Sequence, residues 1–103
     1  MDLVFLLSLL VFHEGRGEPV KCQKAAVEVV YNRVKHPSFP NTVHSVVHQP
    51  NAFSWTRNRF NFKKPQKEAE SWKESNEVVR DFLSNKTNYS KGAIYFNTRS
   101  MGV

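Results

Sequence analysis

The stretch VFHEGRGEPVKCQKAAVEVVYNRV (residues 11–34) decides how the first half of the chain is arranged. It starts at the end of a long apolar run, passes through a Gly-Arg-Gly turn and continues as a second pattern of helical spacing. We expect the first helix to extend from about Asp2 to His13 and to stop at the glycines, because glycine commonly ends helices. Two glutamates, Glu14 and Glu18, flank the turn. A carboxylate at the end of a buried helix costs free energy of folding, so a glutamate at this position suggests a functional role.

The apolar run LVFLLSLLVF (Leu3–Phe12) is interpreted as a helix of the core. It resembles the hydrophobic part of a secretory signal, but the only charge before it is that of Asp2, and no small-x-small cleavage site follows. It is also shorter than the roughly 20 apolar residues that span a bilayer. Because the run is apolar nearly all round, we expect neighbouring elements to cover it on most sides. We therefore predict neither a signal peptide nor a transmembrane segment.

Three further helices are predicted after the turn. Pro19 suits the first turn of the second helix, which carries apolar residues at helical spacing. The segment TVHSVVHQ predicts a short helix capped by Asn41 or Thr42. From Gln66 to Leu83, apolar residues form one stripe with charged residues on the other face, which is typical of an amphipathic helix.

Two segments are predicted as strands, so we expect an α+β fold with several helices and a small antiparallel sheet. The strand-like segments are AFSWT (residues 52–56) and GAIYFNT (residues 92–98). The basic segment RNRFNFKKPQK (residues 57–67) contains a proline and is predicted as a surface loop. A length of 103 residues suits a single domain that occupies the whole chain.

The net charge of the chain indicates which classes of partner it favours. Fifteen basic against nine acidic residues give a formal net charge of +6, which favours a polyanionic partner such as nucleic acid or a bacterial envelope polymer. The single cysteine, Cys22, excludes an internal disulfide and a multi-cysteine zinc site. His44 and His48 have the spacing of a metal pair, but spacing suggests no third ligand, so we expect no metal and no cofactor.

The position of Glu14 suggests acid chemistry. Glu14 continues the apolar face formed by the residues three, four and seven positions before it, which are Val11, Leu10 and Leu7. Burial there and the negative end of the helix dipole both raise the pKa of a carboxyl group, whereas nearby Arg16 would lower it. A carboxyl group that stays protonated near neutral pH is what a general acid for glycosidic bond cleavage needs. The alternative is an exposed Glu14 that is simply paired with Arg16.

Glu18 is open to two interpretations. Just before Pro19 its charge can serve the first turn of the second helix, or it can be a second carboxylate that acts on water or on a sugar. The surrounding HEGRGE is not the zinc-protease motif H-E-x-x-H, because the fourth residue after His13 is Gly17.

Together these residues resemble the SleB-type cell-wall hydrolase family, which includes spore cortex-lytic enzymes and phage-borne wall hydrolases. The resemblance begins with EGRGEP, followed by Gln23, Ala25, Val29 and NRV, and continues through PSFPNTV, Phe53-Ser54 and GAIYFN. It covers most of the chain, from about Leu3 to Asn97. Gly15 stands where the family has alanine, and Glu28 stands where the family is apolar or small, which we interpret as a solvent-facing position.

The resemblance implies a small lysozyme-like catalytic domain that cuts the glycan strand of peptidoglycan between N-acetylmuramic acid and N-acetylglucosamine. In a lytic transglycosylase, one glutamate at the end of a helix protonates the leaving oxygen and then acts as a base while the muramic acid 6-hydroxyl closes on C1. Glu14 matches that catalytic glutamate. Glu18 is a second catalytic candidate, which would make the enzyme a hydrolytic muramidase.

The remaining candidate residues are assigned to substrate binding. Asn32, with Arg33, is expected to support the Glu14 loop by hydrogen bonds, or else to cap its helix. Ser54 and Trp55 are expected to give a polar contact and a sugar-stacking surface, whereas Phe53 is expected to lie in the core. Tyr95 and Asn97 alternate along the last predicted strand and would line the groove from one face.

The expected partners are therefore peptidoglycan glycan strands and anionic envelope polymers, and we expect a monomer. The competing hypothesis is a nucleic-acid-binding module built on Arg57 to Lys67, where Phe60 and Phe62 alternate with basic residues. The expected place of action is the bacterial cell wall, in the periplasm or outside the cell. Without a signal peptide, a phage lysis system or a virion would deliver the protein there.

Overall fold

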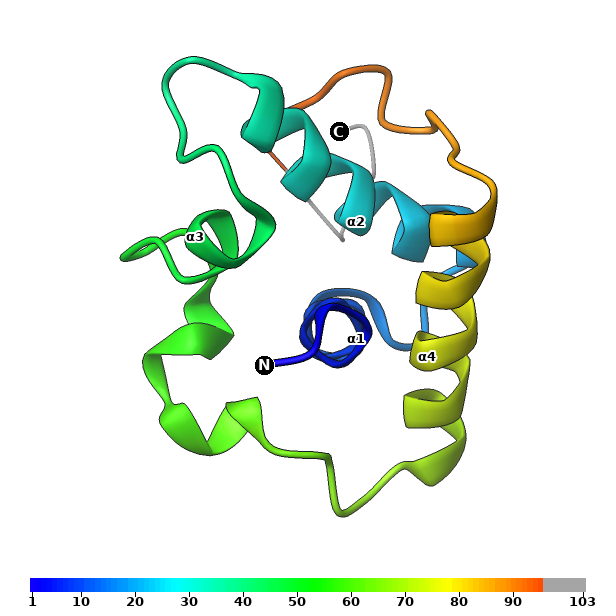
Figure 1. Ribbon diagram of the computed structural model, residues 1–103. Helices are drawn as coiled ribbons and strands as arrows, with labels where there is room; N and C mark the ends of the chain where they lie inside the picture. The colour runs from blue at the N-terminus through cyan, green and yellow to red at the C-terminus, as the bar shows by residue number, and fades with distance from the viewer. Residues whose placement is uncertain (96–103) are drawn as a thin grey trace.

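The computed structural model describes residues 1–95, which form four α-helices and two short 3₁₀-helices (Figure 1). These elements are α1 (Leu3–Gly15), α2 (Val20–Lys35), α3 (Val43–Val47), η1 (Ser54–Arg57), η2 (Arg59–Phe62) and α4 (Ala69–Ser84). No strand occurs among the described residues, so the predicted α+β fold with an antiparallel sheet is wrong and the described chain is all-helical.

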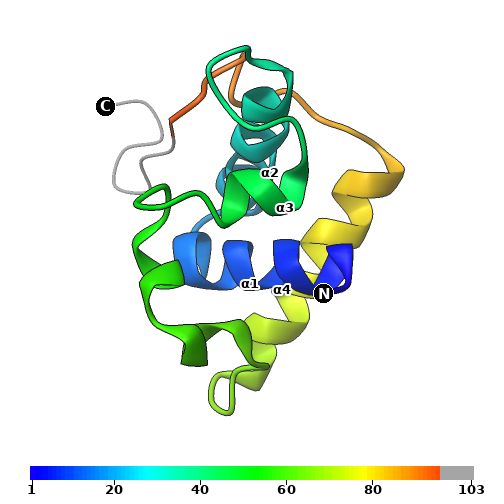
Figure 2. The same ribbon diagram turned by 60° about the vertical axis from the view of Figure 1, so that its left-hand side comes forward.

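Helix α1 occupies the centre of the molecule. Figure 1 looks along its axis and shows α2, α3 and α4 around it, and Figure 2 shows it from the side. The side chains of Leu6, Leu7, Leu9, Leu10 and Val11 are completely shielded from solvent. The predicted core helix is therefore confirmed, and its lack of a polar face follows from its enclosure on several sides.

Residues at and between the ends of α1 and α2 explain where these two helices begin and end. The Asp2 carboxylate accepts a hydrogen bond of 3.0 Å from the backbone N–H of Phe5, which caps the start of α1. Gly17 has a φ of +87°, a conformation that side chains with a Cβ rarely adopt, so the chain turns there between α1 and α2. Pro19 directly precedes α2 and accepts hydrogen bonds from Cys22 and Gln23 through its backbone carbonyl, and the small residues Ala25 and Ala26 of α2 are buried.

The other two α-helices also lie where the sequence predicts them. Thr42, one of the two expected caps, accepts a hydrogen bond of 3.1 Å from the N–H of Ser45 at the start of α3. Helix α4 is amphipathic, and its apolar side packs on α1. The ring of Trp72 makes edge-to-face contacts with Phe5 and Phe12 at centroid distances of 5.6 and 6.0 Å.

Both predicted strands are wrong within the described residues, for two different reasons. The segment AFSWT enters the 3₁₀-helix η1, where the Thr56 hydroxyl donates to the Phe53 carbonyl at 2.7 Å. In the last segment, residues 92–95 form no strand because side chains of α2 bond the carbonyl groups of Ala93 and Ile94. Residues 96–98 of that predicted strand lie outside the described part of the chain.

The basic segment over residues 57–67 is a surface loop, as predicted, interrupted by η2. None of its side chains is buried, and Phe60 is 62 % exposed. Among residues 1–95, no helix combines the length and the apolar character needed to cross a membrane.

Candidate active site

Glu14 lies in the last turn of α1, one residue before the helix ends, and its side chain is half-buried. Burial raises the pKa of its carboxyl group above 4.5, and the positive charge of Arg33 acts in the opposite direction. The predicted desolvation of Glu14 is therefore confirmed. The cation that lowers its pKa is Arg33 of α2 and not the expected Arg16.

Arg33 is a fixed positive charge near this acid. Its side chain is 5 % exposed, and its guanidinium lies over three aromatic rings at 5.0–5.4 Å, those of Phe39, Phe53 and Tyr95. The Nε atom of Arg33 donates to the carbonyl of Ile94 at 2.7 Å. These contacts hold the cation in place, so its influence on Glu14 is built into the fold.

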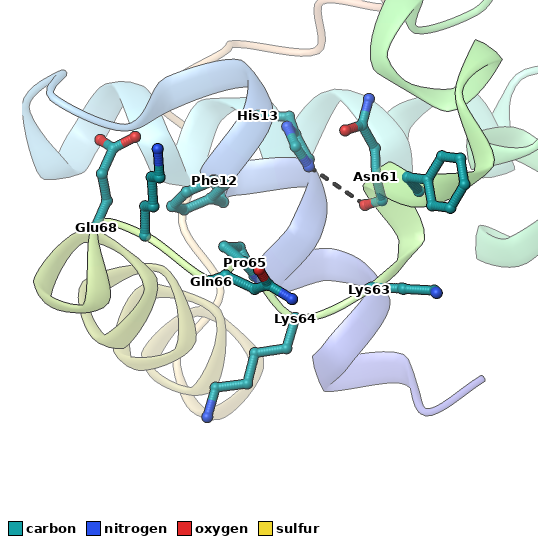
Figure 3. A pocket seen from close by; sticks show the side chains of 10 residues that line it. Phe12, His13, Asn61, Lys63, Lys64, Pro65, Gln66 and Glu68 are labelled. Carbon is teal, nitrogen blue, oxygen red and sulfur yellow. Dashed lines mark hydrogen bonds between the residues drawn. The ribbon is translucent and has the colours of Figure 1, made fainter.

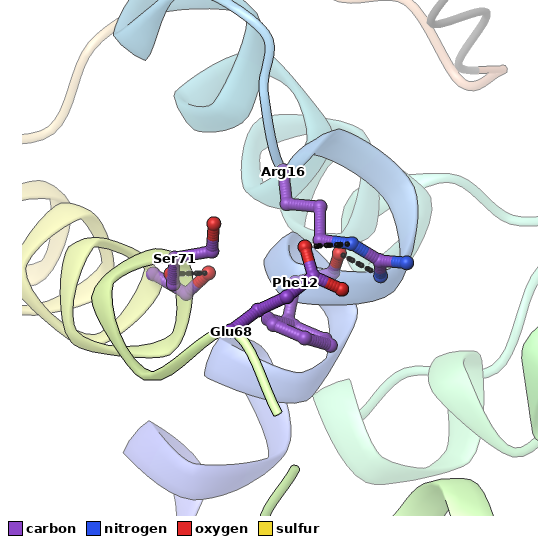
Figure 4. Close-up of polar contacts among 5 residues, drawn as sticks. Phe12, Arg16, Glu68 and Ser71 are labelled. Carbon is purple, nitrogen blue, oxygen red and sulfur yellow. Dashed lines mark hydrogen bonds and ion pairs between the residues drawn. The ribbon is translucent and has the colours of Figure 1, made fainter. Parts of the chain in front are cut away.

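Arg16 connects the end of α1 to the start of α4 (Figure 4). Its Nε atom lies 3.1 Å from the carboxylate of Glu68, and its Nη1 atom donates to the carbonyl of Phe12 at 3.2 Å. The guanidinium also lies 4.5 Å from the centre of the Phe12 ring. The alternative that Arg16 pairs with Glu14 is therefore wrong, because Arg16 pairs with Glu68.

The turn that carries Glu18 is braced by Gln23, a fully buried residue of α2. The amide of Gln23 donates to the carbonyl of Glu18 at 2.9 Å and to the carboxylate of Glu74 at 2.8 Å. Gly15 faces Gln23, and a Cβ atom at Gly15 would make an ordinary van der Waals contact of 3.4 Å with the Cγ atom of Gln23. The backbone of Glu18 is thus fixed, whereas no ion pair within residues 1–95 holds its half-buried carboxylate.

His13, the residue before Glu14, forms a stacked layer with Trp55. Their rings lie 4.9 Å apart at an angle of 16°. The Nε2 atom of His13 lies 3.3 Å from the carbonyl oxygen of Asn61, which only accepts, so the ring carries its proton on Nε2 (Figure 3). Burial lowers the pKa of His13, which favours the neutral ring.

The other predicted site residues differ in how far they are exposed to solvent. Trp55 is 6 % exposed and packs on His13 and Phe62, so its ring lies inside the molecule. Ser54 is exposed at the start of η1, and Tyr95 is 73 % exposed beside Arg33. Phe53 lies in the core, as predicted.

Asn32 holds the segment after α4 and not the Glu14 turn. Its amide donates to the hydroxyl of Ser90 at 3.1 Å and to the carbonyl of Ala93 at 2.9 Å. It is not a helix cap, because α2 continues to Lys35 and is capped by His36. Asn97, the remaining candidate, lies outside the described residues.

Two hollows lie beside the Glu14 region. One, of about 600 Å³, is bounded by the end of α1 and the basic loop (Figure 3). Its lining is formed by Phe12, His13, Phe60, Asn61, Lys63, Lys64, Pro65, Gln66, Lys67 and Glu68. The second, of about 300 Å³, includes Arg33, Phe39 and Tyr95. Glu14 directly follows a residue of the first hollow and interacts with a residue of the second.

Sequence reasoning missed two parts of this region. The sequence alone indicates no role for His13, because its contact with Asn61 joins residues 48 positions apart, which no local pattern shows. The predicted solvent-facing position of Glu28 is wrong, because Glu28 is 3 % exposed and accepts hydrogen bonds from Thr87 and Ser90. Its position four residues before Asn32, on the same side of α2, was the available signal.

The structure also shows where the two candidate metal ligands lie. His44 Nε2 is 2.8 Å from the carbonyl of Met1, and His48 Nδ1 is 2.8 Å from the carbonyl of His44. Within residues 1–95, no group of three or more His, Cys, Asp or Glu side chains is arranged to hold a metal ion.

Comparison with known proteins places this region in context. The model of the family described as Cell Wall Hydrolase matches residues 17–102, a range that begins just after Glu14 and Arg16. The spore cortex-lytic enzyme of Bacillus subtilis (strain 168) is 33 % identical over 92 residues, which are 89 % of this chain and 28 % of that protein. That of Bacillus cereus is 47 % identical over 49 residues, 48 % of this chain and 19 % of the relative.

The spore cortex-lytic enzyme of Halalkalibacterium halodurans is 41 % identical over 49 residues, or 48 % of this chain and 15 % of the relative. The chain thus spans between 15 % and 28 % of the length of these three relatives. No solved structure matches the chain.

Proposed function

The chain belongs to the SleB-type Cell Wall Hydrolase family, and on that basis we propose that it degrades peptidoglycan by cleaving the bond between N-acetylmuramic acid and N-acetylglucosamine. The observation that carries the proposal is the half-buried Glu14 at the end of the enclosed helix α1, whose pKa burial raises. A raised pKa keeps the carboxyl group protonated to higher pH, which is the state a general acid needs. The place of action is accordingly the bacterial cell wall.

In the proposed reaction, Glu14 donates its proton to the glycosidic oxygen while the bond from C1 of muramic acid to that oxygen breaks. The bonding electron pair stays with the oxygen, which leaves as a hydroxyl group of N-acetylglucosamine. The Glu14 carboxylate then accepts the proton of the muramic acid 6-hydroxyl as its oxygen bonds to C1. The product ends in 1,6-anhydromuramic acid, Glu14 is protonated again, and no water is consumed.

Arg33 supports this cycle through its charge. Glu14 is negatively charged between the two proton transfers, and a fixed cation nearby stabilises that form. Burial favours the acid form and Arg33 favours the base form, so one carboxyl group can serve in both roles. The single-acid route is favoured over hydrolysis with Glu18, because Glu14 lies at the end of the enclosed helix α1 under the charge of Arg33, whereas Glu18 lies in the turn, where Gln23 holds its backbone carbonyl.

The test is digestion of purified peptidoglycan by the wild-type protein and by Glu14→Gln, followed by mass spectrometry of the released muropeptides. We expect anhydro ends, lighter by one water than reducing ends, and a loss of activity of about 10²-fold or more in Glu14→Gln, as for removal of a general acid. Glu18→Gln should weaken activity without changing the product. Full activity of Glu14→Gln would refute the assignment of Glu14.

The products also separate the two enzymatic routes. Reducing ends throughout, in a protein that still depends on Glu14, would make the enzyme a hydrolase and place Glu18 in the catalytic pair. A protein that binds oligonucleotides with a steep salt dependence and never releases muropeptides would instead be a nucleic-acid-binding module.

A further inference from the structure

The cleft between the end of α1 and the basic loop has the size and the lining of a binding site. Its volume of about 600 Å³ lies within the range of ligand pockets. Phe12, His13 and Pro65 give it apolar surface, and Gln66 adds a side-chain amide, whereas the Asn61 amide donates to the carbonyl of Trp55. Figure 3 shows Lys63 and Lys64 extending outward from the loop at its edge.

The cleft carries an excess of positive charge. Lys63, Lys64 and Lys67 line it, and none of them forms an ion pair with a carboxylate within residues 1–95. The one acidic residue of the lining, Glu68, is paired with Arg16 (Figure 4). Arg16, which does not line the cleft, thus neutralises the charge of Glu68, and three lysine ammonium groups remain for an anionic ligand.

The position of the cleft limits what that anion can be. His13 lines the cleft and lies with Glu14 in the last turn of α1, so the cleft opens at the same end of that helix as the proposed acid, and a glycan strand bound there extends beyond the sugar at Glu14. In peptidoglycan, the lactyl group of muramic acid carries a peptide stem with free carboxylates close to the bond that is cleaved. A phosphate polymer joined through the muramic acid 6-hydroxyl would instead block the ring closure proposed above.

We infer that this lysine cleft binds the carboxylates of the peptide stem while Glu14 acts on the glycan strand, so that the enzyme recognises stem-bearing glycan. The inference rests on the proposed function and names the part of the substrate that the cleft takes. Lysine ammonium groups bind the carboxylates, and the side-chain amide of Gln66 can hydrogen-bond a ligand that itself contains amides. The apolar wall suits the aliphatic part of the stem.

The experiment measures binding by calorimetry in the Glu14→Gln background, so that the ligand is not consumed. The ligands are purified soluble glycan strands that carry stems, the same strands after an amidase has removed the stems, and purified wall teichoic acid. The test variant replaces all three cleft lysines, Lys63, Lys64 and Lys67, by glutamine. The control variant replaces Lys21, Lys35 and Lys73, which are exposed and lie outside the cleft, so that both variants lose the same charge.

We expect the cleft variant to bind stem-bearing strands about tenfold more weakly at low salt and stem-free strands as tightly as its parent. The control variant should retain its affinity for both. An equal loss of affinity in both variants, an equal loss for stem-free strands, or an effect confined to teichoic acid would each overturn the inference. All six lysines are exposed, so thermal unfolding should show the fold of both variants intact.

This measurement can be separated from the test of the reaction. If the Glu14-dependent release of anhydro products is observed and the cleft variant binds normally, the cleft inference fails and the proposed function stands. If stem-bearing strands bind through the cleft lysines but no products form, the proposed reaction fails and the binding site stands.

Discussion

At the scale of single residues, the acid at the end of α1 is under two opposing influences. Burial raises the pKa of Glu14, and Arg33 lowers it. Burial also lowers the pKa of Arg33, and Tyr95 and Glu14 act in the opposite direction on that group. Because burial is the larger influence, folding takes up a proton at Glu14 between pH 4.5 and its raised pKa. The contribution of Glu14 to stability therefore falls as the pH rises through that interval.

The charge of Arg33 should set the upper pH limit of activity. In Arg33→Gln the lowering influence is removed, so the pKa of Glu14 rises further and the proton is held to higher pH. We expect the alkaline limb of kcat/KM against pH, measured on soluble glycan strands, to move to higher pH. The maximal rate should fall, because the Glu14 carboxylate formed during the reaction loses a stabilising charge.

Arg33→Lys is the matched control, since it keeps the charge but loses the planar group that lies over the Phe39 and Phe53 rings. Its alkaline limb should stay closer to that of the wild type than that of Arg33→Gln. Identical pH profiles for all three proteins would show that Arg33 does not act on Glu14 in solution.

The sequence predicted one half of this pair. The apolar residues on the face of α1 that Glu14 continues were enough to predict its burial. The partner was not predictable in the same way, because Arg33 is 19 residues further on and approaches only when α2 folds back on α1. Arg16 is near Glu14 in sequence, but its contact with Glu68 depends on the packing of α4.

At the scale of elements, three side chains of α2 bind the segment that follows α4. Glu28 accepts hydrogen bonds from the hydroxyl of Thr87 and from the N–H of Ser90, the latter at 2.6 Å. One turn later, Asn32 and Arg33 donate to carbonyl groups of the same segment. The alternation of apolar and polar residues there is typical of a strand, yet helix side chains supply the hydrogen bonds that a sheet would give.

Glu28→Gln should loosen this segment. The carboxylate accepts from two donors, and an amide keeps one acceptor oxygen while it adds donor hydrogens beside groups that also donate. Because Glu28 is 3 % exposed, we expect a loss of about 1–3 kcal/mol in the free energy of unfolding, measured by denaturant titration. Amide hydrogen exchange should increase over residues 87–94.

Glu77→Gln is the control for Glu28→Gln. It makes the same chemical change at an exposed position of α4, so it should alter the free energy of unfolding by no more than about 0.5 kcal/mol. A Glu28→Gln variant as stable as Glu77→Gln would mean that the contacts of Glu28 contribute nothing net to the fold.

At the scale of the whole molecule, α1 is the element on which the others pack. The sequence predicted this from composition alone, because a helix without a polar face has to be covered on most sides. The number of elements that cover α1 and their order around it were not predictable from the sequence of α1, since they depend on where the apolar residues of the other helices lie.

Leu10→Ala tests how much of the stability depends on this helix. Leu10 is fully buried, so the substitution removes apolar contacts and leaves a cavity, with an expected cost of about 3–5 kcal/mol. That is a large share of the roughly 5–15 kcal/mol that stabilise a typical domain. Thermal and denaturant unfolding should both show the loss.

The same substitution at Leu3, which is only partly buried at the start of α1, should cost less than half as much. Equal costs at the two positions would contradict the central placement of α1, because burial would then not decide the penalty.

The enclosure of α1 also governs how the molecule can open. A helix covered by α2, α3 and α4 cannot exchange its amide hydrogens by a local fluctuation, so the backbone that carries Glu14 should open only when the whole domain unfolds. Within the basic loop, Asn61 and Phe62 contact His13 and Trp55, whereas residues 63–67 have no buried side chain and can move aside more easily. A long polymer can thus displace this part of the loop as it enters and leaves, while the carboxyl group of Glu14 stays in position at the end of α1.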